Sequence, residues 1–216
     1  VVVIVQRAFS RGNAARFSWR VYDCRFFAAN MNTDSFLAAL AAHVATDHDE
    51  ENHRRRMAQF VVSNRHDWWK RSTRDGHVTG SAWILNHAAT HALLLHHRKL
   101  NLWVQPGGHL DDSDASPAAG AMREAQEETG IPNLSLADTV VFDVDIHDIS
   151  ARVGKHGTEP AHLHYDVRYL IMATDARVTI SEESLDAKWM PLQALAQPSH
   201  ERSIARMAKK SLRLKQ

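Results

Sequence analysis

The chain has 216 residues, of which 44% are hydrophobic and 24% charged, and its formal net charge is +1. These are values of an ordinary globular protein with one sizeable core, and the balanced charge argues against a basic nucleic-acid-binding surface or an acidic tail. No apolar run approaches the roughly 18–20 residues that span a bilayer, so we expect no membrane partner. The single cysteine, Cys24, excludes an intrachain disulfide and fits a reducing compartment, so we expect a cytoplasmic protein.

Residues 1–30 differ in composition from the rest of the chain. They begin Val-Val-Val-Ile-Val and carry five arginines but a single acid, Asp23. Five apolar residues without a preceding basic segment are too few for a secretory signal, whereas an arginine-rich, acid-poor start mimics a transit peptide. A translation start placed upstream of Met31 is the simpler alternative. We therefore expect residues 1–30 to be poorly ordered or not native to the protein.

Residues 31–77 are predicted to form a helical extension. Apolar residues at helical spacing and polar flanks predict two helices, at residues 34–46 and 48–64. The second helix begins within a mixed charge run, Asp47 to Arg56, which is typical of a solvated face. The connector after it contains Trp68 and Trp69. We expect these two aromatic side chains to anchor the extension to the main domain, and stacking on a base is the alternative.

The main domain is predicted over residues 78–216 and is rich in strands. Strands are expected at residues 81–85, 92–97, 102–104, 139–146 and 162–172, a loop at 150–160, and helices at 192–196 and 199–213. Strands at this density around one central helix predict an α/β (α+β) fold in which a mixed sheet is covered by helices on both faces.

The central helix is the best-defined element in the sequence. Ser116 is expected to cap its start, Pro117 to occupy its first position, and Gly130 to end it. Before it come a glycine turn, Gly107-Gly108, and an acidic loop. Small and apolar residues at helical spacing form one stripe that we expect to be buried: Ala118, Met122, Ala125 and Thr129.

The opposite face of this helix carries three carboxylates, because Glu124, Glu127 and Glu128 stand at i, i+3 and i+4. Like-charge pairs at this spacing each destabilise a helix by roughly 0.2–0.5 kcal/mol, and Arg123 can pair with Glu127 without neutralising all three. A hard divalent cation can neutralise them, and oxygen ligands suit Mg²⁺ or Mn²⁺. A solvated acidic face is the alternative, which the glycine turn at a fixed distance disfavours.

Residues Gly108 to Ile131 resemble the signature of the Nudix hydrolase superfamily: Gly, five residues, Glu, seven residues, then Arg-Glu-apolar-x-Glu-Glu-x-Gly-apolar. The second half matches at every fixed position from Arg123 onward. In the first half, Asp114 stands at the Glu position, and eight residues separate it from Arg123, which we interpret as a one-residue insertion before the helix. The signature covers 24 residues, and the family's domain would cover roughly residues 78 to 197.

The resemblance implies a Nudix-type α/β/α sandwich and divalent-metal-dependent hydrolysis of a diphosphate bond, commonly in a nucleoside diphosphate derivative. It implies that Glu127 and Glu128 bind the metal, with Glu128 the strongest ligand, and that Glu124 completes the metal shell or activates water. Gly108 lets the backbone approach closely, and a carbonyl in its turn could complete the coordination. Arg123 is expected to orient a carboxylate. The implied cofactor is Mg²⁺ or Mn²⁺, and the implied partner is a small diphosphate-containing molecule.

Many Nudix proteins recruit one more acid from outside the signature, as a base or as a metal ligand. Glu183 lies six residues before Trp189, in a predicted turn where such an acid often falls. Glu182 and Glu159 compete for this role. The alternative for Glu183 is an ordinary acid on a surface turn, and the sequence does not decide between these readings.

The strand expected at residues 162–172 has one polar face. His162, His164, Asp166 and Arg168 point one way because side chains alternate along a strand. This face could line the substrate cleft, with His164 and Arg168 receiving phosphate, Asp166 holding an imidazole and His162 beside them. It could instead form a polar ladder, hydrogen-bonded to a neighbouring strand through Asp143, Asp145 or His147. A dedicated zinc site, suggested by His-x-His-x-Asp, is the third reading.

Three other functions compete with hydrolysis. A non-catalytic Nudix-like sensor or binding module would usually lack signature carboxylates, whereas Glu124, Glu127 and Glu128 are all present. A Nudix-like isopentenyl-diphosphate isomerase would need a catalytic cysteine, and Cys24 lies far outside the domain. An RNA-binding or decapping role has little support from a net charge of +1. The sequence leaves a homodimer open.

Overall fold

The computed structural model describes residues 2–9, 16–23, 31–154 and 157–214. Near the N-terminus, β1 (Val2–Phe9) and β2 (Arg16–Asp23) pair in antiparallel register. The expectation of a poorly ordered or non-native start falls partly on residues 1, 10–15 and 24–30, which lie outside the described residues, and it stays a prediction. No helix within the described ranges is both long and apolar enough to cross a membrane.

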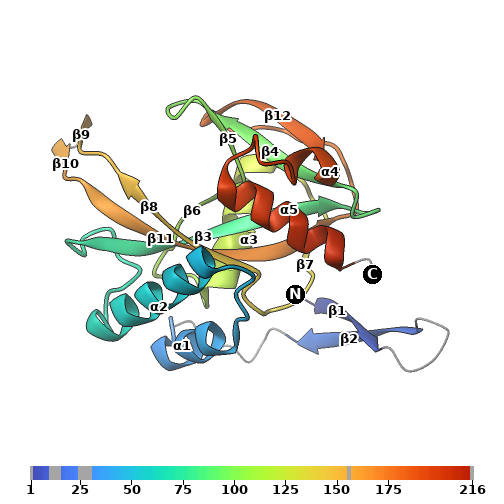
Figure 1. Ribbon diagram of the computed structural model, residues 1–216, viewed down its shortest axis with the longest axis horizontal. Helices are drawn as coiled ribbons and strands as arrows, with labels where there is room; N and C mark the ends of the chain where they lie inside the picture. Colours follow the sequence, from blue (N-terminus) through green and yellow to red (C-terminus); the bar gives the residue numbers. More distant parts are fainter. Residues whose placement is uncertain (1, 10–15, 24–30, 155–156, 215–216) are drawn as a thin grey trace.

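An eight-stranded mixed sheet forms the centre of the molecule (Figure 1). Its strands are β3 (Gly76–Asn86), β4 (His91–His97), β5 (Leu102–Val104), β6 (Gly107–His109), β7 (Leu134–Leu136), β8 (Asp143–Ile149), β11 (His162–Ala173) and β12 (Ser184–Pro191). The order β12-β4-β3-β11-β7 is extended by β5 on β4, β6 on β3 and β8 on β11. β3 and β11 run parallel and the other pairs run antiparallel, which confirms the predicted mixed sheet.

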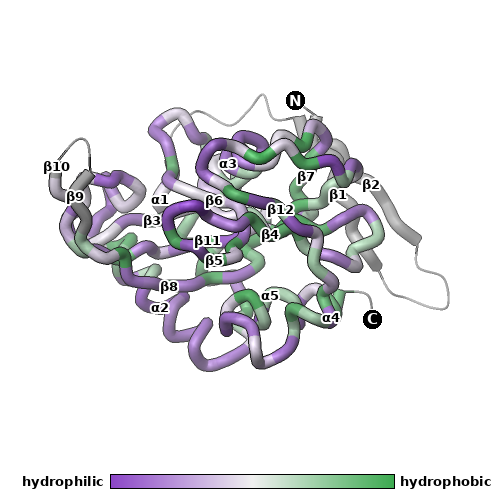
Figure 2. The backbone as a smooth tube through the Cα atoms, turned by 90° about the horizontal axis from the view of Figure 1, so that it is seen from above, coloured by the Kyte–Doolittle hydropathy of each residue, from purple (hydrophilic) through white to green (hydrophobic). Residues whose placement is uncertain are grey.

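Helices cover both faces of this sheet, as predicted. They are α1 (Thr33–Ala42), α2 (His48–Ser63), α3 (Pro117–Thr129), α4 (Leu192–Leu195) and α5 (Arg202–Arg213). On β3, Ala82 and Ile84 pack in one core with Ala125 of α3, whereas Trp83 packs in another with Met207 of α5. Because alternate strand residues face opposite sides, α3 and α5 sandwich the sheet between them (Figure 2).

Trp68 and Trp69 join the helical extension to the sheet domain, which confirms their predicted anchoring role. Trp68 is fully buried and stacks on Phe36 of α1 with ring centroids 4.8 Å apart. Trp69 donates from its indole nitrogen to Asp112 Oδ1 at 2.7 Å, in the acidic loop before α3. The extension therefore shares a hydrophobic core with β3, β8 and β11, through residues that include Phe60, Val78, Val144 and Tyr165.

Some boundaries differ from those expected. The first helix ends at Ala42 because His43 adopts an extended backbone, and the strand expected from residue 139 begins only at Asp143. Residues 150–160 were expected as a loop but contain a small hairpin of β9 (Arg152–Gly154) and β10 (Gly157–Glu159). The glycine turn at 107–108 forms part of a strand, β6, which pairs with β3.

The charge run at the start of α2 is not fully solvated, which corrects one expectation. Glu50 is 0% exposed and accepts hydrogen bonds from Lys210 of α5, from His43 Nε2 at 2.8 Å and from Thr46 N at 2.7 Å. Lys210 Nζ also donates to Asp143 Oδ2 of β8 at 2.8 Å, and Asp143 is itself fully buried. This buried ion network ties the helical extension to the C-terminal helix.

Acid should weaken the fold through Glu50. Burial opposes ionisation of this carboxyl, but hydrogen bonds from His43 and Lys210 outweigh it and hold its pKa well below the usual range. A depressed carboxyl pKa stabilises the fold above the unfolded value near 4.5 and loses that contribution as pH falls further. We therefore expect the free energy of unfolding to fall below about pH 4.5, and to fall less steeply in Glu50→Gln.

Urea denaturation at several pH values measures this difference, because the midpoint reports stability when the slope is constant. Arg206 and Thr46, which also face the Glu50 carboxylate, do not titrate in this range. The comparison is therefore made between pH 3 and 5, where histidine stays protonated in the unfolded chain. Equal acid dependence in the wild type and Glu50→Gln would contradict the assignment.

Candidate active site

The carboxylate helix α3 begins and ends at the residues that the sequence indicates. Ser116 Oγ accepts from Ala119 N at 3.2 Å, Pro117 takes the first helical position, and Gly130 ends the helix in the left-handed conformation at φ 59°. Ala125 and Thr129 are buried against the sheet. The other side of α3 therefore presents its carboxylates toward β6 and the turn before β12.

The two glycines of β6 allow the backbone to approach these carboxylates. Gly107 N donates to Glu128 Oε2 at 2.9 Å. A Cβ on Gly108 would lie 2.7 Å from Glu124 Oε2, and a Cβ on Gly107, whose φ is +155°, would lie 2.2 Å from Ser81 Oγ. A side chain at Gly108 would push β6 away from α3, and one at Gly107 would push it away from β3, so the glycine pair fixes the position of this strand beside the carboxylates.

Arg123 organises the acidic side of the site through five hydrogen bonds. Its Nη1 donates to Glu124 Oε1 at 2.8 Å and to Glu127 Oε2 at 3.2 Å. Its Nη2 donates to the His109 carbonyl at 2.9 Å and to Asp114 Oδ2 at 2.9 Å, and its Nε donates to Asp114 Oδ1 at 3.1 Å. All five guanidinium protons are used, so Arg123 is a positioning residue for Glu124, Glu127 and β6.

Asp114, whose role the sequence left open, is a partner of Arg123. It is 5% exposed, and besides the paired guanidinium bond it accepts from Asp111 N at 2.8 Å. Asp111 in turn accepts from Ser113 N at 2.8 Å, and its carbonyl accepts from Asp114 N at 3.0 Å. The loop is thus closed by its own hydrogen bonds, which accommodates one extra residue before the helix.

The site carries more negative charge than its surroundings stabilise. Burial raises the pKa of Glu128 to about 7; the Gly107 N–H opposes this shift, and the charges of Glu124, Glu183 and Glu127 add to it. Burial likewise raises the pKa of Glu124 against the effect of Arg123. Oxygen donors with uncompensated charge fit a hard divalent cation such as Mg²⁺ or Mn²⁺.

The segment before β12 brings Glu183 toward the end of α3. Thr179 N donates to the Thr129 carbonyl at 2.8 Å and Ser181 N to the Glu128 carbonyl at 3.3 Å. Glu183 itself is exposed, and its charge contributes to the raised pKa of Glu128. Among the three candidate extra acids, Glu183 is therefore placed to face the helical carboxylates.

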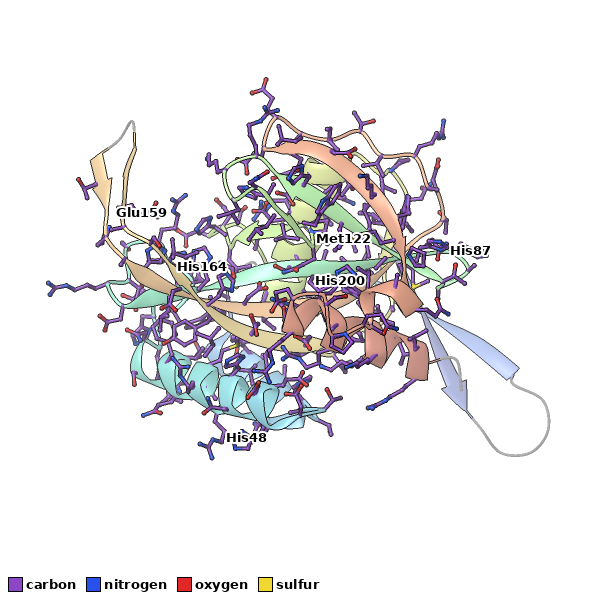
Figure 3. The ribbon with its side chains drawn as sticks, turned by 45° about the horizontal axis from the view of Figure 1, so that its top comes forward. His48, His87, Met122, Glu159, His164 and His200 are labelled. Carbon is purple, nitrogen blue, oxygen red and sulfur yellow. The ribbon has the colours of Figure 1, made fainter. Side chains whose placement is uncertain are left out.

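The competing acids are placed differently. Glu182 is exposed in the same turn as Glu183. Glu159 lies on β10, where it accepts from Arg71 Nη2 at 3.2 Å, at the hairpin end of the molecule and away from Met122 of α3 (Figure 3). That position does not bring Glu159 to the signature carboxylates.

Arg168 lies in a buried ion cluster. It is 3% exposed and donates to Asp166 Oδ2 at 2.7 Å, Asp143 Oδ1 at 3.2 Å and Asp145 Oδ2 at 3.4 Å. A guanidinium that is buried and shared by three carboxylates is not presented to a substrate phosphate. Arg168 therefore belongs to a polar ladder between neighbouring strands, which was one of the predicted alternatives. The expectation that it contacts a substrate phosphate is wrong.

Residues 77–210, well over half of the chain, match the family model described as the NUDIX domain. The chain belongs to the Nudix family. The matched segment includes the whole signature from Gly108 to Ile131 and begins within one residue of the predicted domain start at residue 78. The protein is accordingly a pyrophosphohydrolase, an enzyme that cleaves a pyrophosphate bond.

Several solved structures of Nudix proteins resemble this chain. A NUDIX-family hydrolase from Clostridium perfringens is 24% identical, with 65% of this chain and 98% of that chain covered and a TM-score of 0.47. A C. elegans Ap4A hydrolase in a binary complex is 18% identical, with 63% and 96% covered and a TM-score of 0.45. The NUDIX domain of Shewanella oneidensis NrtR, complexed with ADP ribose, is 18% identical, with 72% and 97% covered and a TM-score of 0.47. No curated protein matches the chain at a significant level.

The Nudix fold gathers some predicted site residues and separates others. Glu124, Glu127, Glu128, Arg123 and Gly108 come together around the α3–β6 contact, and Glu183 approaches them. His162 and His164 lie elsewhere, in a cluster with two histidines that the sequence did not single out, His77 and His109. Only the strand register could have revealed that cluster, because its members come from three strands.

Replacing Arg123 by lysine should slow the Nudix reaction without unfolding the protein. An ammonium group cannot reproduce five N–H bonds in a fork, and loss of a group that orients ligands typically lowers activity about 10- to 100-fold. Steady-state kinetics would measure kcat for Arg123→Lys beside Arg177→Lys, whose guanidinium is 88% exposed and pairs with Asp175. A wild-type kcat in Arg123→Lys would show that catalysis does not depend on the placement of Glu124 and Glu127 by the Arg123 guanidinium.

Proposed function

We propose that this Nudix enzyme requires Mg²⁺ or Mn²⁺ and cleaves the diphosphate of a nucleoside diphosphate-linked or related small molecule. One observation carries the proposal: half-buried Glu128 is held by the Gly107 N–H beside Glu124, with its pKa raised to about 7. An anionic substrate would be repelled by this charge. A divalent cation between the two reverses the local field and makes binding favourable.

The cation would be held by Glu128, Glu127 and Glu124, with a carbonyl of the Gly108 turn and Glu183 as further oxygen donors. When bound, it would polarise the phosphorus and lower the pKa of a coordinated water. The protein's own contribution is placement of the oxygen donors. The Gly107 N–H fixes one oxygen of Glu128 and leaves the other available.

Proton transfer from the attacking water needs a carboxylate that is not bound in a salt bridge. Glu124 shares the Arg123 guanidinium, whereas Glu183 is exposed in the turn before β12. Glu183 and Glu124 are therefore the two candidates for the general base. A Glu183→Gln variant with a strongly reduced kcat and an altered pH profile would assign the role to Glu183.

The experiment is a hydrolysis screen with purified full-length protein. Nucleoside triphosphates, nucleotide sugars, dinucleoside polyphosphates and NADH would be incubated with Mg²⁺, with Mn²⁺ and with EDTA. The proposal expects cleavage of at least one diphosphate-containing compound with either metal and none with EDTA. Tight nucleotide binding without cleavage of any compound would favour a sensor and contradict the proposal.

A further inference from the structure

Four histidine rings meet on the polar face of the sheet. His77 comes from β3, His109 from β6, and His162 and His164 from β11. The ring centroid of His77 lies 4.8 Å from that of His164, 4.9 Å from that of His109 and 5.1 Å from that of His162. The His109 and His164 centroids are 5.2 Å apart. The cluster thus joins segments that are far apart in the sequence.

The rings hold nitrogen atoms that lack hydrogen-bond partners. Among the described residues, no partner faces either nitrogen of His77 or the buried Nε2 atoms of His109, His162 and His164. Each buried polar atom left unpaired destabilises a protein, and such groups are rare in native structures. Five of them in one place therefore need an explanation, and a shared ligand satisfies several at once.

Their surroundings favour the neutral imidazole form of His77, His109 and His164. Burial lowers the pKa of His77 to about 4, of His109 to about 3 and of His164 to about 2, and the neighbouring histidines add to the shift. A neutral imidazole offers a lone pair, which suits a metal ion and does not suit a phosphate. His162 Nδ1 lies 2.9 Å from the Pro160 carbonyl, so donation to that carbonyl leaves the Nε2 lone pair available.

We propose that His77, His109 and His164 form a second metal site, for a nitrogen-preferring transition-metal ion such as Zn²⁺. Ligand nitrogens of the three residues all lie within 4.8 Å of one another. Zn–N distances of about 2.0–2.1 Å place tetrahedral ligand nitrogens roughly 3.4 Å apart, so small ring rotations would close the site. His162 is next to the three ligands and is the candidate for the fourth position.

This site differs in chemistry from the carboxylate site on α3. Imidazole nitrogen favours Zn²⁺ and its late transition-metal neighbours, whereas carboxylate oxygen favours Mg²⁺ and Mn²⁺. The two sites are nevertheless adjacent along β6, because His109 follows Gly108 and its carbonyl accepts from Arg123 at 2.9 Å. An ion on the histidines would tie β3, β6 and β11 together and so hold the glycine backbone against the catalytic helix.

Solvent reaches the edge of the cluster. An open cavity of about 500 Å³ is lined by residues from the connector after α2 and from the start of β11, among them Arg71, Glu159, Pro160 and His162. A metal ion therefore has an approach route at the His162 side. The inference stands apart from the proposed hydrolysis, because it rests on different residues and a different donor element.

The test measures metal content directly on protein from which any affinity tag has been removed. After dialysis against EDTA and then against limiting Zn²⁺ with excess Mg²⁺, elemental analysis should find about one zinc per chain. Replacement by Co²⁺ should give the visible absorption of a tetrahedral nitrogen site. Failure of the wild-type protein to retain zinc or to give this spectrum would overturn the proposal.

Variants locate the ion. His109→Gln and His164→Gln should weaken zinc binding at least about 100-fold, since even outer-shell changes alone cost 10–100-fold. His87→Gln is the matched control, because His87 is exposed on the β3–β4 turn at the opposite end of the sheet from His164 (Figure 3). Glu128→Gln should keep its zinc. Zinc lost from Glu128→Gln but retained by both histidine variants would place the ion in the carboxylate site and refute the proposal.

Circular dichroism and thermal melting separate metal loss from misfolding. Zinc should raise the melting temperature of the wild type and of His87→Gln and leave folded His109→Gln unchanged. An equal rise in all three proteins would indicate binding elsewhere and would contradict the assignment. His109 is the preferred position for this comparison because it is less buried than His77, which is 1% exposed.

Discussion

Glu128→Gln should lower kcat at least about a thousandfold while leaving the protein folded. A bound metal contributes several kcal/mol of transition-state stabilisation, and each 1.36 kcal/mol is a factor of ten in rate. Glutamine keeps the shape of the side chain, and its carbonyl can still accept the Gly107 N–H that Glu128 accepts at 2.9 Å. It removes only the negative charge that a divalent cation at the proposed site would need.

The Glu128→Gln variant should not be less stable than the wild type, so a loss of activity cannot be attributed to unfolding. Burial raises the pKa of Glu128 to about 7, so the folded protein disfavours the charged carboxylate relative to the unfolded chain. The unfavourable contribution is absent at low pH and grows as pH rises above the unfolded value near 4.5. In metal-free buffer at pH 8, Glu128→Gln should therefore melt at or above the wild-type temperature.

Glu51→Gln is the matched control for activity. Glu51 lies on α2, where it pairs with Arg54 on the surface. Its replacement should leave kcat within about twofold of the wild type, because Glu51 lies on α2 outside the candidate site and surface changes rarely alter folding stability by more than about 0.5 kcal/mol. A wild-type kcat in Glu128→Gln would contradict the assignment of the metal site to α3.

Lys210→Met should destabilise the fold by about 3–5 kcal/mol, the usual loss when one partner of a buried ion pair is removed. The Lys210 ammonium donates to Glu50, to the Phe142 carbonyl at 2.8 Å and to Asp143 Oδ2 at 2.8 Å. All three protons are used, and both carboxylates are 0% exposed. Methionine fills the volume but leaves two buried negative charges undercompensated.

Urea denaturation measures this loss, and the neighbouring residue supplies the control. Lys209 is exposed on the same helix, so Lys209→Met should change stability by less than about 0.5 kcal/mol. Arg206 also pairs with Asp143, at 2.8 Å, and would partly offset the loss at that carboxylate. Equal stability of the two variants would show that the ion network does not hold α2 to α5.

The sequence is informative where local chemistry decides the structure. Ser116 and Pro117 define the start of α3, and Gly130 defines its end, because caps act through adjacent backbone groups. The spacing of Glu124, Glu127 and Glu128 then follows from the helical repeat. The resemblance to the Nudix signature then predicts, from the sequence alone, that these carboxylates bind a metal ion.

Long-range contacts are what the sequence does not reveal. Glu50 lies in a charge run that is typical of a solvated face, but its partner Lys210 is 160 residues away along the chain. His77 and His109 join the cluster only because β3 pairs in parallel with β11 and β6 pairs with β3. The sequence predicts that Arg168 binds phosphate, but in the structure Arg168 forms ion pairs with Asp143 and Asp145 of the neighbouring strand.

The structure of the segment before α3, residues 107–114, is the other feature that the sequence does not predict. Gly107 and Gly108 have little strand propensity, so β6 was expected as a turn, although three residues suffice to pair with β3. Asp114 stands where the signature has glutamate, and its shorter side chain serves to hold Arg123. Gly107 and Arg123 therefore both contact the carboxylates of α3, and Asp114 holds Arg123 in place.

Hydrolysis in water enriched in heavy oxygen tests the central claim most directly. The products of the best substrate from the screen would be analysed by mass spectrometry for the wild type and for Glu128→Gln. We expect heavy oxygen in the phosphate of one product only, with Mg²⁺ or Mn²⁺ present, and labelled product from Glu128→Gln at a rate at least about a thousandfold lower. Unlabelled products, or labelled product formed at equal rates by both proteins, would contradict water attack at a diphosphate through the carboxylates of α3.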